Sequence, residues 1–364
     1  MGSQLDIQPI SHWLPKIDNP LLISGPCSLE SEEQTMATAF ELAKDKRVFV
    51  YRGGIWKPRT RPGSFEGMGS IALGWLKKVK QETGLMIGTE VANAQHVEEC
   101  LKAGVDVMWI GARSTASPFV VQEIADVLKG TDQIVMVKNP VNPDVQLWIG
   151  ALERLNQAGL KNLVAIHRGF TPFGESKYRN YPSWKTVIEL RQLIPNLPII
   201  CDPSHISGKR EFLFEISQKA FDLGLDGLML ESHINPSVAL SDKDQQVTPF
   251  ELGKILDKLV IRYTNSDDPL FENMLDTLRS RIDGIDHEII EILASRNEIV
   301  KQIAMYKKQN KVTALQISRW TQLLEDRLST ARKLNLDETF IKIIFQLIHE
   351  DSVRLQTDIM DAED

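Results

Sequence analysis

With 364 residues, of which 42% are hydrophobic and 25% charged, the chain has the composition of a globular protein and is long enough for two domains. A formal net charge of −7 argues against a general nucleic-acid-binding protein, because such proteins need a basic surface to neutralise phosphates. No apolar run approaches the roughly 20 residues of a membrane span, no signal peptide is predicted, and three widely spaced cysteines fit a reducing compartment, so we expect a cytoplasmic protein without a membrane partner.

Short apolar runs alternate with amphipathic stretches between Leu21 and Ser232. The runs are LLISG, RVFVY, LMIGT, VDVMWIG, IVMV, NLVAI, LPIIC and GLMLE, and they are continuously apolar, as in strands covered on both faces of a parallel sheet. Eight such strand–helix units predict an α/β fold closed into a (β/α)8 TIM barrel, with a doubly wound open sheet as the alternative. Residues typical of a helix start precede four of the amphipathic stretches: Ser31, Asn93, Ser117 and Thr248.

A reactive or charged residue lies at or just past the end of every apolar run. Because the carboxyl ends of parallel strands meet at one face of a barrel, we expect these side chains to converge on a single site. Four are cations, two are carboxylates, one is a thiol and one an imidazole: Cys27, Arg52, Glu90, Arg113, Lys138, Arg168, His205 and Glu231.

Cys27, His205 and Glu231, together with Asp242 further along the chain, form a mixed set of possible metal ligands. A single cysteine is more often a small buried hydrophobe, and a single histidine is more often a structural residue. Three of the four lie at strand ends of the repeat, which favours a metal site. Sulfur, nitrogen and oxygen donors together suit manganese, iron, cobalt or zinc better than magnesium or calcium.

Cations are unusually frequent at this end of the predicted barrel. A buried cation is costly unless an anion lies nearby, and the carboxylates Glu90 and Asp202 are too few to pair with all of them. Substrates that carry phosphate or carboxylate groups are therefore expected. The cations are Arg52, Arg113, Lys138 and Arg168 at strand ends, and Lys57, Arg59 and Arg61 in the loop WKPRTRPGSF.

The strings GPCS, RGG-x-x-KPRT, GAR, VKNP, HRGF, CDPSH, ESH and SD-x-x-Q follow one another from about residue 20 to residue 262. They resemble the 3-deoxy-D-arabino-heptulosonate 7-phosphate (DAHP) synthases, metal-dependent (β/α)8 barrels that condense phosphoenolpyruvate with erythrose 4-phosphate in aromatic biosynthesis. The resemblance implies a divalent metal cofactor, Mn²⁺ first, with Co²⁺, Fe²⁺ or Zn²⁺ as alternatives. It implies Cys27, His205, Glu231 and Asp242 as metal ligands, Arg52, Lys57, Arg113, Lys138 and Arg168 around phosphoenolpyruvate with Lys57 also catalytic, and Arg59 and Thr60 at the sugar phosphate.

The sequence departs from this family at two places. Arg61 stands where serine is more frequent, and Lys243 with Asp244 replaces the usual Gly-Pro after Asp242, which leaves open which aspartate binds metal. The sister synthase that joins the same enol donor to arabinose 5-phosphate is the nearest alternative. The string KPRT argues against that sister, which has a different loop at this position.

Beyond residue 262 the strand pattern ends, and a polar segment at residues 263–269 precedes long helical patterns at 270–308, 316–333 and 337–360. We therefore predict a barrel domain at 1–262, a linker at 263–269 and an all-α domain of three helices at 270–364. Three helices of this size rarely close a core alone, so the domain is expected to form a homodimer.

Polar residues interrupt the apolar stripes of the first and last of these helices. Arg296 lies on a stripe of isoleucines, and Ser352 and Gln356 interrupt the last helix one turn apart. The pattern alone leaves open a snorkelling arginine with a buried hydrogen-bonded pair, or a binding site.

From Leu270 to about Met360, the strings LRSRID, ASRNEIV, YKK and IHEDSV-x-x-Q resemble the all-helical chorismate mutases, which are intertwined dimers. The resemblance implies the rearrangement of chorismate to prephenate. It implies Arg296, Lys307 and Gln356 as catalytic residues, and Arg319, Ser352 and the partner subunit's Arg279 as substrate-binding residues.

Two positions depart from the mutase pattern, because Gln316 stands where aspartate is frequent and Trp320 where glutamate commonly contacts the substrate hydroxyl. The alternative is a dimerisation and allosteric module that binds chorismate or prephenate without converting it. The fusion of the two domains suggests that prephenate or chorismate, bound at the helical domain, inhibits the barrel.

Overall fold

The structure is a computed structural model that describes residues 5–14, 20–57, 63–172, 174–262 and 268–362. The chain divides into two compact units, Met1–Thr264 and Asn265–Asp364, called here the barrel unit and the helical unit. Each is described by itself. Among the described helices, none combines the length and apolar character needed to cross a lipid bilayer.

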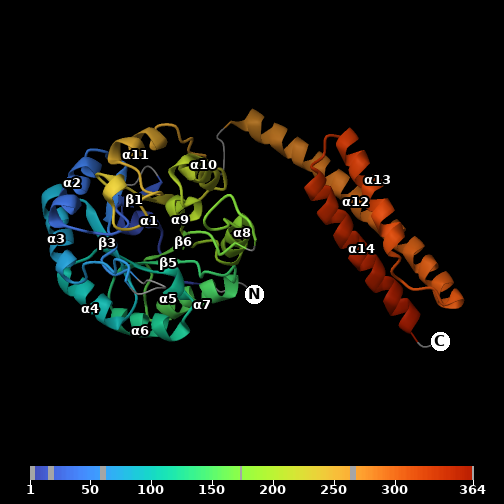
Figure 1. Cartoon of the computed structure of the whole chain (residues 1–364), viewed down its shortest axis with the longest axis horizontal. Coiled ribbons are helices and arrows are strands. Elements are labelled where there is room, and N and C mark those ends of the chain that lie inside the picture. Colours follow the sequence, from blue (N-terminus) through green and yellow to red (C-terminus); the bar gives the residue numbers. More distant parts are fainter. Residues whose placement is uncertain (1–4, 15–19, 58–62, 173, 263–267, 363–364) are drawn as a thin grey trace. The chain divides into compact units, whose positions relative to one another are not determined.

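Eight parallel strands form a closed barrel in which each strand pairs with the next in sequence and β8 pairs with β1 (Figure 1). The predicted (β/α)8 barrel is thereby confirmed, and the alternative of an open sheet is wrong. The strands are β1 Leu21–Gly25, β2 Val48–Arg52, β3 Met86–Val91, β4 Val107–Ile110, β5 Ile134–Lys138, β6 Leu163–His167, β7 Ile199–Cys201 and β8 Gly227–Glu231.

Most helices of the barrel unit surround its strands as an outer ring (Figure 1). The first helix is an exception, because Ile10 and Trp13 pack against the apolar interior of the barrel. The short helices α5 and α9 directly follow β4 and β7, so they belong to the carboxyl end of the barrel. The helices are α1 Ile10–Trp13, α2 Glu32–Ala43, α3 Ile71–Thr83, α4 Ala94–Ala103, α5 Ala112–Thr115, α6 Pro118–Leu128, α7 Val145–Gln157, α8 Trp184–Leu193, α9 Pro203–Ser207, α10 Leu213–Asp222 and α11 Pro249–Leu256.

The predicted helix starts are confirmed at four helices of this ring. The side chain of Ser31 accepts a hydrogen bond from the backbone N–H of Gln34 at 3.1 Å, and Asn93 caps α4 in the same way. Thr248 and Glu251 form a reciprocal capping box at α11. Ser117 precedes α6 as predicted, although its side chain makes no capping hydrogen bond. These caps satisfy backbone donors that have no partner inside the helix.

The barrel unit has two apolar layers because its strands are buried on both faces. One layer, with Trp109 as its largest member, fills the interior of the barrel, and the other lies between strands and helices. Such an interior is a packed core rather than a channel, so polar groups can gather only beyond the strand ends. The architecture therefore directs the charged strand-end residues to one face.

The helical unit consists of α12 Pro269–Asn310, α13 Ile317–Lys333 and α14 Glu338–Asp361, with α14 packed against the other two helices. Few of its described side chains are buried within the chain, namely Val300, Ala304, Ala331, Ser352 and Gln356. The isoleucine stripe of α12 is exposed, including Ile285 at 56% and Ile289 at 50%. The stripe therefore does not face a helix of its own chain.

Candidate active site

A polar pocket of about 460 Å³ lies at the carboxyl end of the barrel. Its walls come from the segments that follow β2 to β8, so residues far apart in sequence face a common space. The structure thus brings most of the charged strand-end residues together. Those that line the pocket are Lys57, Glu90, Arg113, Lys138, Arg168, His205 and Asp242.

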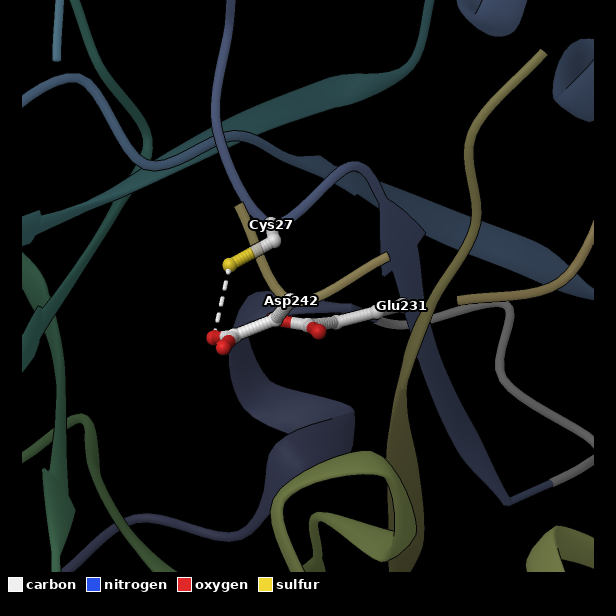
Figure 2. A group of neighbouring side chains, drawn as sticks. All are labelled: Cys27, Glu231 and Asp242. Atoms are coloured by element: carbon white, nitrogen blue, oxygen red, sulfur yellow. Dashed lines mark hydrogen bonds between the residues drawn. The ribbon is translucent and has the colours of Figure 1, made fainter. Parts of the chain in front are cut away.

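Cys27, Glu231 and Asp242 gather on one side of this face, with one potential ligand atom from each lying within 4.8 Å of the others (Figure 2). Cys27 follows β1 and Glu231 ends β8, and these two strands are hydrogen-bonded neighbours. Asp242 lies in the loop after β8, where its Oδ2 accepts a hydrogen bond from the Cys27 Sγ at 3.3 Å. His205 stands beside the group, with its Nε2 at 3.8 Å from Glu231 Oε1.

The donor chemistry of this cluster fits a divalent transition metal. Burial, together with the negative charge of Glu231, raises the pKa of the Cys27 thiol to about 12, because a thiolate is costly away from water and beside a carboxylate. Glu231 Oε1 is buried and accepts no hydrogen bond from the described residues. The buried thiol and the carboxylates of Glu231 and Asp242 would all be stabilised by a cation, and sulfur with oxygen and imidazole nitrogen suits manganese, iron, cobalt or zinc.

A buried aspartate orients His205. Asp202 caps α9 by accepting a hydrogen bond from the backbone N–H of His205 at 3.1 Å, and its Oδ2 lies 2.8 Å from His205 Nδ1. Carboxylates commonly hold one nitrogen of a metal-binding histidine so that the other faces the ion. Here that other nitrogen is the Nε2 nearest to Glu231.

Two of the four strand-end cations form buried ion pairs. Arg52 Nη2 lies 3.2 Å from Glu231 Oε1, and Lys138 Nζ lies 3.0 Å from Asp202 Oδ2. Burial opposes the charge of Arg52, but the nearby carboxylates of Glu231 and Asp202 raise its pKa. Arg52 Nε and Nη1 are buried and donate no hydrogen bond to the described residues, so this guanidinium retains capacity to bind an anion.

Arg168 and Arg113 complete the cationic wall of the pocket. Arg168 Nη1 donates to Asn180 Oδ1 at 2.7 Å, and burial lowers the pKa of Arg168 to about 10. Because burial penalises the charge of Arg168, an anionic ligand would stabilise this guanidinium. The wall therefore favours phosphate and carboxylate groups.

Lys57 lines the pocket with the other cations and contacts Cys27 of the candidate ligand cluster. Its Nζ donates to the Cys27 Sγ at 3.0 Å and to the Cys27 carbonyl oxygen at 3.1 Å. Arg59, Thr60 and Arg61, the other members of the predicted loop, lie outside the described residues. Glu90, which we expected to pair with a cation, accepts a hydrogen bond from Trp109 Nε1 at 2.9 Å.

Arg179, Asn180 and Gln245 belong to the site, but the sequence analysis did not identify them. Arg179 Nη1 donates to Asp242 Oδ1 at 3.1 Å and to Gln245 Oε1 at 2.8 Å. Arg179 and Asn180 lie within the connection between β6 and α8, more than ten residues after the end of β6. Proximity to a strand end therefore could not identify them. Gln245, the last residue of the string SD-x-x-Q, could have been found from that string.

In the helical unit the structure brings Arg296, Ser352 and Gln356 together. Arg296 Nη1 donates to Ser352 Oγ at 2.6 Å, and Gln356 Nε2 donates to the Ser352 carbonyl oxygen at 3.1 Å. Gln356 Oε1 is buried and accepts no hydrogen bond from the described residues. Lys307 Nζ donates to the carbonyl oxygen of Ala314 at 2.7 Å.

Arg279 and Arg319, the two other predicted cations of this unit, are exposed and make local contacts. Arg279 Nη1 lies 3.4 Å from Asp276 one helical turn away, and Arg319 Nη1 donates to Gln322 at 3.4 Å. The single chain therefore shows neither of them in contact with the Arg296 group.

An aromatic pair accompanies the Arg296 group. Trp320 stacks on His349 with ring centroids 4.1 Å apart, although the sequence analysis did not single out His349. Burial, together with the positive charges of Arg296 and Lys307, lowers the pKa of His349. Both cations therefore disfavour the protonated form of His349.

Comparison with known sequence families gives two matches in chain order. The DAHP synthetase I family matches residues 16–264, and chorismate mutase type II matches residues 278–357. The two matched regions fall in the barrel unit and the helical unit respectively. Together they indicate two enzymatic activities in one chain.

Individual relatives resemble the barrel unit. The phospho-2-dehydro-3-deoxyheptonate aldolase of Thermotoga maritima is 32% identical over 235 residues, which cover 65% of this chain and 67% of that protein. The 2-dehydro-3-deoxyphosphooctonate aldolase of Burkholderia vietnamiensis is 29% identical over 292 residues, covering 71% and 96%. A crystal structure of the Thermotoga maritima DAHP synthase superposes with a TM-score of 0.62 at 26% identity, covering 69% of this chain and 71% of that one.

Proposed function

Because this chain belongs to the DAHP synthetase I family and carries a chorismate mutase type II region, we propose that it catalyses two separate steps of aromatic biosynthesis in the cytoplasm. The barrel unit condenses phosphoenolpyruvate with erythrose 4-phosphate, and the helical unit rearranges chorismate to prephenate. We assign residues 1–262 to the first domain, 263–269 to the linker and 270–364 to the second. The observation that carries the barrel assignment is that a thiol–carboxylate cluster adjoins a pocket lined by cations, with Asp242 belonging to both.

In this proposal Cys27, His205, Glu231 and Asp242 hold a divalent metal ion, for which Mn²⁺ is our first choice and Co²⁺, Fe²⁺ or Zn²⁺ the alternatives. The bound ion would supply Lewis acidity toward the aldehyde oxygen of the sugar. Cys27 takes part as the thiolate, which requires its proton to leave the buried thiol. His205, oriented by Asp202, presents Nε2 to the ion.

The cationic wall binds phosphoenolpyruvate through its phosphate and carboxylate. Arg52 and Lys138 are fixed by Glu231 and Asp202, so they are oriented before the substrate arrives. Arg113 and Arg168 complete the contacts to the anion, and Lys57 donates to a substrate oxygen from beside Cys27. These fixed donors stabilise the charge that develops on the leaving phosphate. Arg59 and Thr60 are assigned to the phosphate of the sugar on sequence grounds alone.

The identity of the sugar distinguishes this proposal from its nearest alternative, since relatives that make phosphooctonate match at 29% identity. The purified protein is offered phosphoenolpyruvate with either erythrose 4-phosphate or arabinose 5-phosphate, and released phosphate is measured. We expect release with the four-carbon sugar. Equal or faster release with the five-carbon sugar would assign the barrel to the sister reaction.

For the helical unit, the pairing of Arg296 with Ser352 beside Gln356 supports a binding site rather than a purely structural pair. The rearrangement is unimolecular, so the protein must hold the two carboxylates of chorismate in the compact conformer and donate to the ether oxygen as its bond breaks. We assign the carboxylates to Arg296, Arg319, Ser352 and the partner's Arg279, and the ether oxygen to Lys307 and Gln356.

Consumption of chorismate by the full chain tests the second activity. We expect turnover by the parent protein and a loss of at least about 100-fold in kcat/KM for Arg296→Ala, because that guanidinium grips a carboxylate. Binding of chorismate or prephenate without turnover by the parent would instead support the non-catalytic allosteric module.

The exposed isoleucines of α12 support the further proposal that the helical unit forms a homodimer. Six exposed isoleucines along one helix face are unfavourable in water and would be covered by the same face of a second copy. They are Ile282, Ile285, Ile289, Ile292, Ile299 and Ile303. We also propose that prephenate or chorismate bound at the helical unit inhibits the barrel reaction, because one chain carries an early and a later step of the same pathway.

A further inference from the structure

We propose that Arg179 and Gln245 are positioning residues that turn one oxygen of Asp242 and one oxygen of Glu231 toward the ion. This inference rests on the proposed metal-dependent function. Both residues lie outside the assigned ligand set, and neither is assigned to the substrate. They act together as a hydrogen-bonded relay between two carboxylates that the chain supplies from different segments.

The relay consists of three hydrogen bonds in series. Arg179 Nη1 donates to Asp242 Oδ1 at 3.1 Å and to Gln245 Oε1 at 2.8 Å, and Gln245 Nε2 donates to Glu231 Oε2 at 2.7 Å. The amide of Gln245 is thus used at both ends, with its oxygen toward the arginine and its nitrogen toward the carboxylate. That orientation is the one in which both bonds can form.

Each carboxylate keeps its other oxygen for the metal site. Glu231 Oε1 is buried and accepts no hydrogen bond from the described residues, and its charged neighbour is Arg52, whose Nη2 lies 3.2 Å away. Asp242 Oδ2 is 3.3 Å from the Cys27 Sγ, on the side where the three possible ligand atoms meet (Figure 2). The relay therefore binds Asp242 Oδ1 and Glu231 Oε2, and it leaves Asp242 Oδ2 and Glu231 Oε1 for the side of the site that bears Cys27.

A backbone turn brings Gln245 to Asp242. The N–H of Gln245 donates to the carbonyl oxygen of Asp242 at 3.2 Å, and Asp242 has φ of 47°, a left-handed conformation that aspartate tolerates better than most residues. On the other side, Cys27 N–H donates to Gln246 Oε1 at 2.9 Å, and Gln246 Nε2 donates to the Ser241 carbonyl oxygen at 2.8 Å. The loop is thereby tied to the segment that bears the thiol.

Backbone hydrogen bonds join the segment that carries Arg179 to α9, the helix that carries His205. The N–H of Arg179 donates to the Ser207 carbonyl oxygen at 3.2 Å, and the N–H of Asn180 donates to that of Ile206 at 3.0 Å. Asn180 Nδ2 also donates to the carbonyl oxygen of His205 at 2.6 Å. The relay thus connects the elements that carry His205, Asp242 and Glu231.

A role in stability alone does not account for Arg179. Its side chain is 48% exposed, and an ion pair in such a position contributes little to folding because water already solvates both charges. Arg179 instead restrains the orientation of Asp242. Without this hydrogen bond, the carboxylate of Asp242 could rotate about its last torsion and lose its alignment with the other ligands. Outer partners of metal ligands commonly change metal affinity by about 10–100-fold when removed.

The experiment measures binding of Mn²⁺ alone to the metal-free full chain, by competition with a chelating dye. We expect Arg179→Met and Gln245→Leu each to raise the Kd by about 10–100-fold. The double variant should raise it no further than the larger single change, because one relay is broken in all three. Arg179→Lys, which keeps a donor, should recover part of the affinity.

The matched control is Arg191→Met. Arg191 in α8 pairs with Asp226 at 2.8 Å with side chains 34% and 35% exposed, and neither residue lines the pocket. Its Kd for Mn²⁺ should equal that of the parent. Cobalt spectra of each variant provide a second readout, because a thiolate-to-cobalt charge-transfer band reports Cys27 ligation independently of activity.

The proposal of a relay is overturned if the parent binds Mn²⁺ and the Kd of Arg179→Met lies within twofold of the parent Kd. It is also overturned if the free-energy changes of the two single variants add fully in the double variant. Failure of the proposed function has a different signature, in which the parent itself binds no divalent transition metal, or binds it and condenses no sugar phosphate with phosphoenolpyruvate. Arg179 is half exposed, so Arg179→Met decides the result even if Gln245→Leu does not fold.

Discussion

Lys138 and Asp202 form a buried ion pair, and we expect the stability of the barrel unit to depend on both partners. Their charged atoms are 3.0 Å apart, and both side chains are buried. Burial opposes ionisation of Asp202, yet His205 and Lys138 hold the pKa of that carboxyl well below its usual value. Removal of the lysine would leave a buried carboxylate without its ammonium partner.

We expect Lys138→Met to lower the free energy of unfolding of the metal-free protein by about 3–5 kcal/mol, since a single partner is lost from a buried pair. Denaturant titration of the barrel transition measures this change. Lys177→Met is the control, because Lys177 pairs with Glu215 at the surface with side chains 51% and 53% exposed. That change should leave the free energy of unfolding close to that of the parent, because water already solvates both charges. A similar loss in both variants would contradict the buried-pair argument.

Residues could be predicted from the sequence where the repeat of the fold constrains them. Arg168 and Glu231 follow apolar runs, and the topology alone places strand ends at one face. Arg179 could not be found in this way, because it lies within a long loop whose path depends on contacts with α9. The roles of all these residues in binding and catalysis stay predictions.

At the scale of elements, the sequence predicts where helices begin and which of their faces are apolar, but it does not predict which surface covers each apolar face. The capping residues Asn93 and Thr248 indicated where α4 and α11 begin, because a cap acts locally. The stripe that contains Ile285 and Ile289 indicated an apolar face of α12. A pattern of this kind shows that a face needs a cover but not whether the cover comes from the same chain.

The exposed face of α12 gives a prediction about assembly. Ile285→Glu places a charge on the proposed interface and should weaken self-association by roughly 2 kcal/mol or more, because a desolvated carboxylate is costly. Sedimentation velocity over a range of protein concentrations measures the shift toward monomer. Ile188→Glu in α8, at a position that is 46% exposed on the barrel unit, should leave the association unchanged. A parent protein that is monomeric throughout would refute the dimer.

For the whole molecule, the two activities should respond differently to metal removal. The candidate metal-ligand cluster of Cys27, Glu231 and Asp242 lies in the barrel unit, and the described part of the helical unit contains no comparable group. Dialysis against a chelator should therefore abolish condensation and leave the conversion of chorismate unchanged. Addition of Mn²⁺ should restore the first activity. Loss of both activities on chelation would contradict this prediction, because it would show that the helical unit also needs the metal for its activity.

The feedback proposal also concerns the whole molecule. Prephenate should inhibit condensation by the full chain, and removal of residues 264–364 should abolish that inhibition while the barrel keeps its activity. The measurement is the rate of phosphate release with and without prephenate. A truncated barrel that is still inhibited would place the effector site in the barrel unit and refute the proposal.

The barrel closes where its first strand meets its last, and the cluster of Cys27, Glu231 and Asp242 lies at that seam. Cys27 and Asp242 are 215 residues apart in the chain. A nascent chain that ends before Asp242 therefore lacks a complete ligand set, however well its first strands have folded. An ion held across the seam would act as a clasp between the two ends of the domain, and such a clasp restricts the unfolded chain more as the enclosed loop lengthens. Uptake of metal would then require that synthesis has passed Asp242 and that the first and last strands have paired.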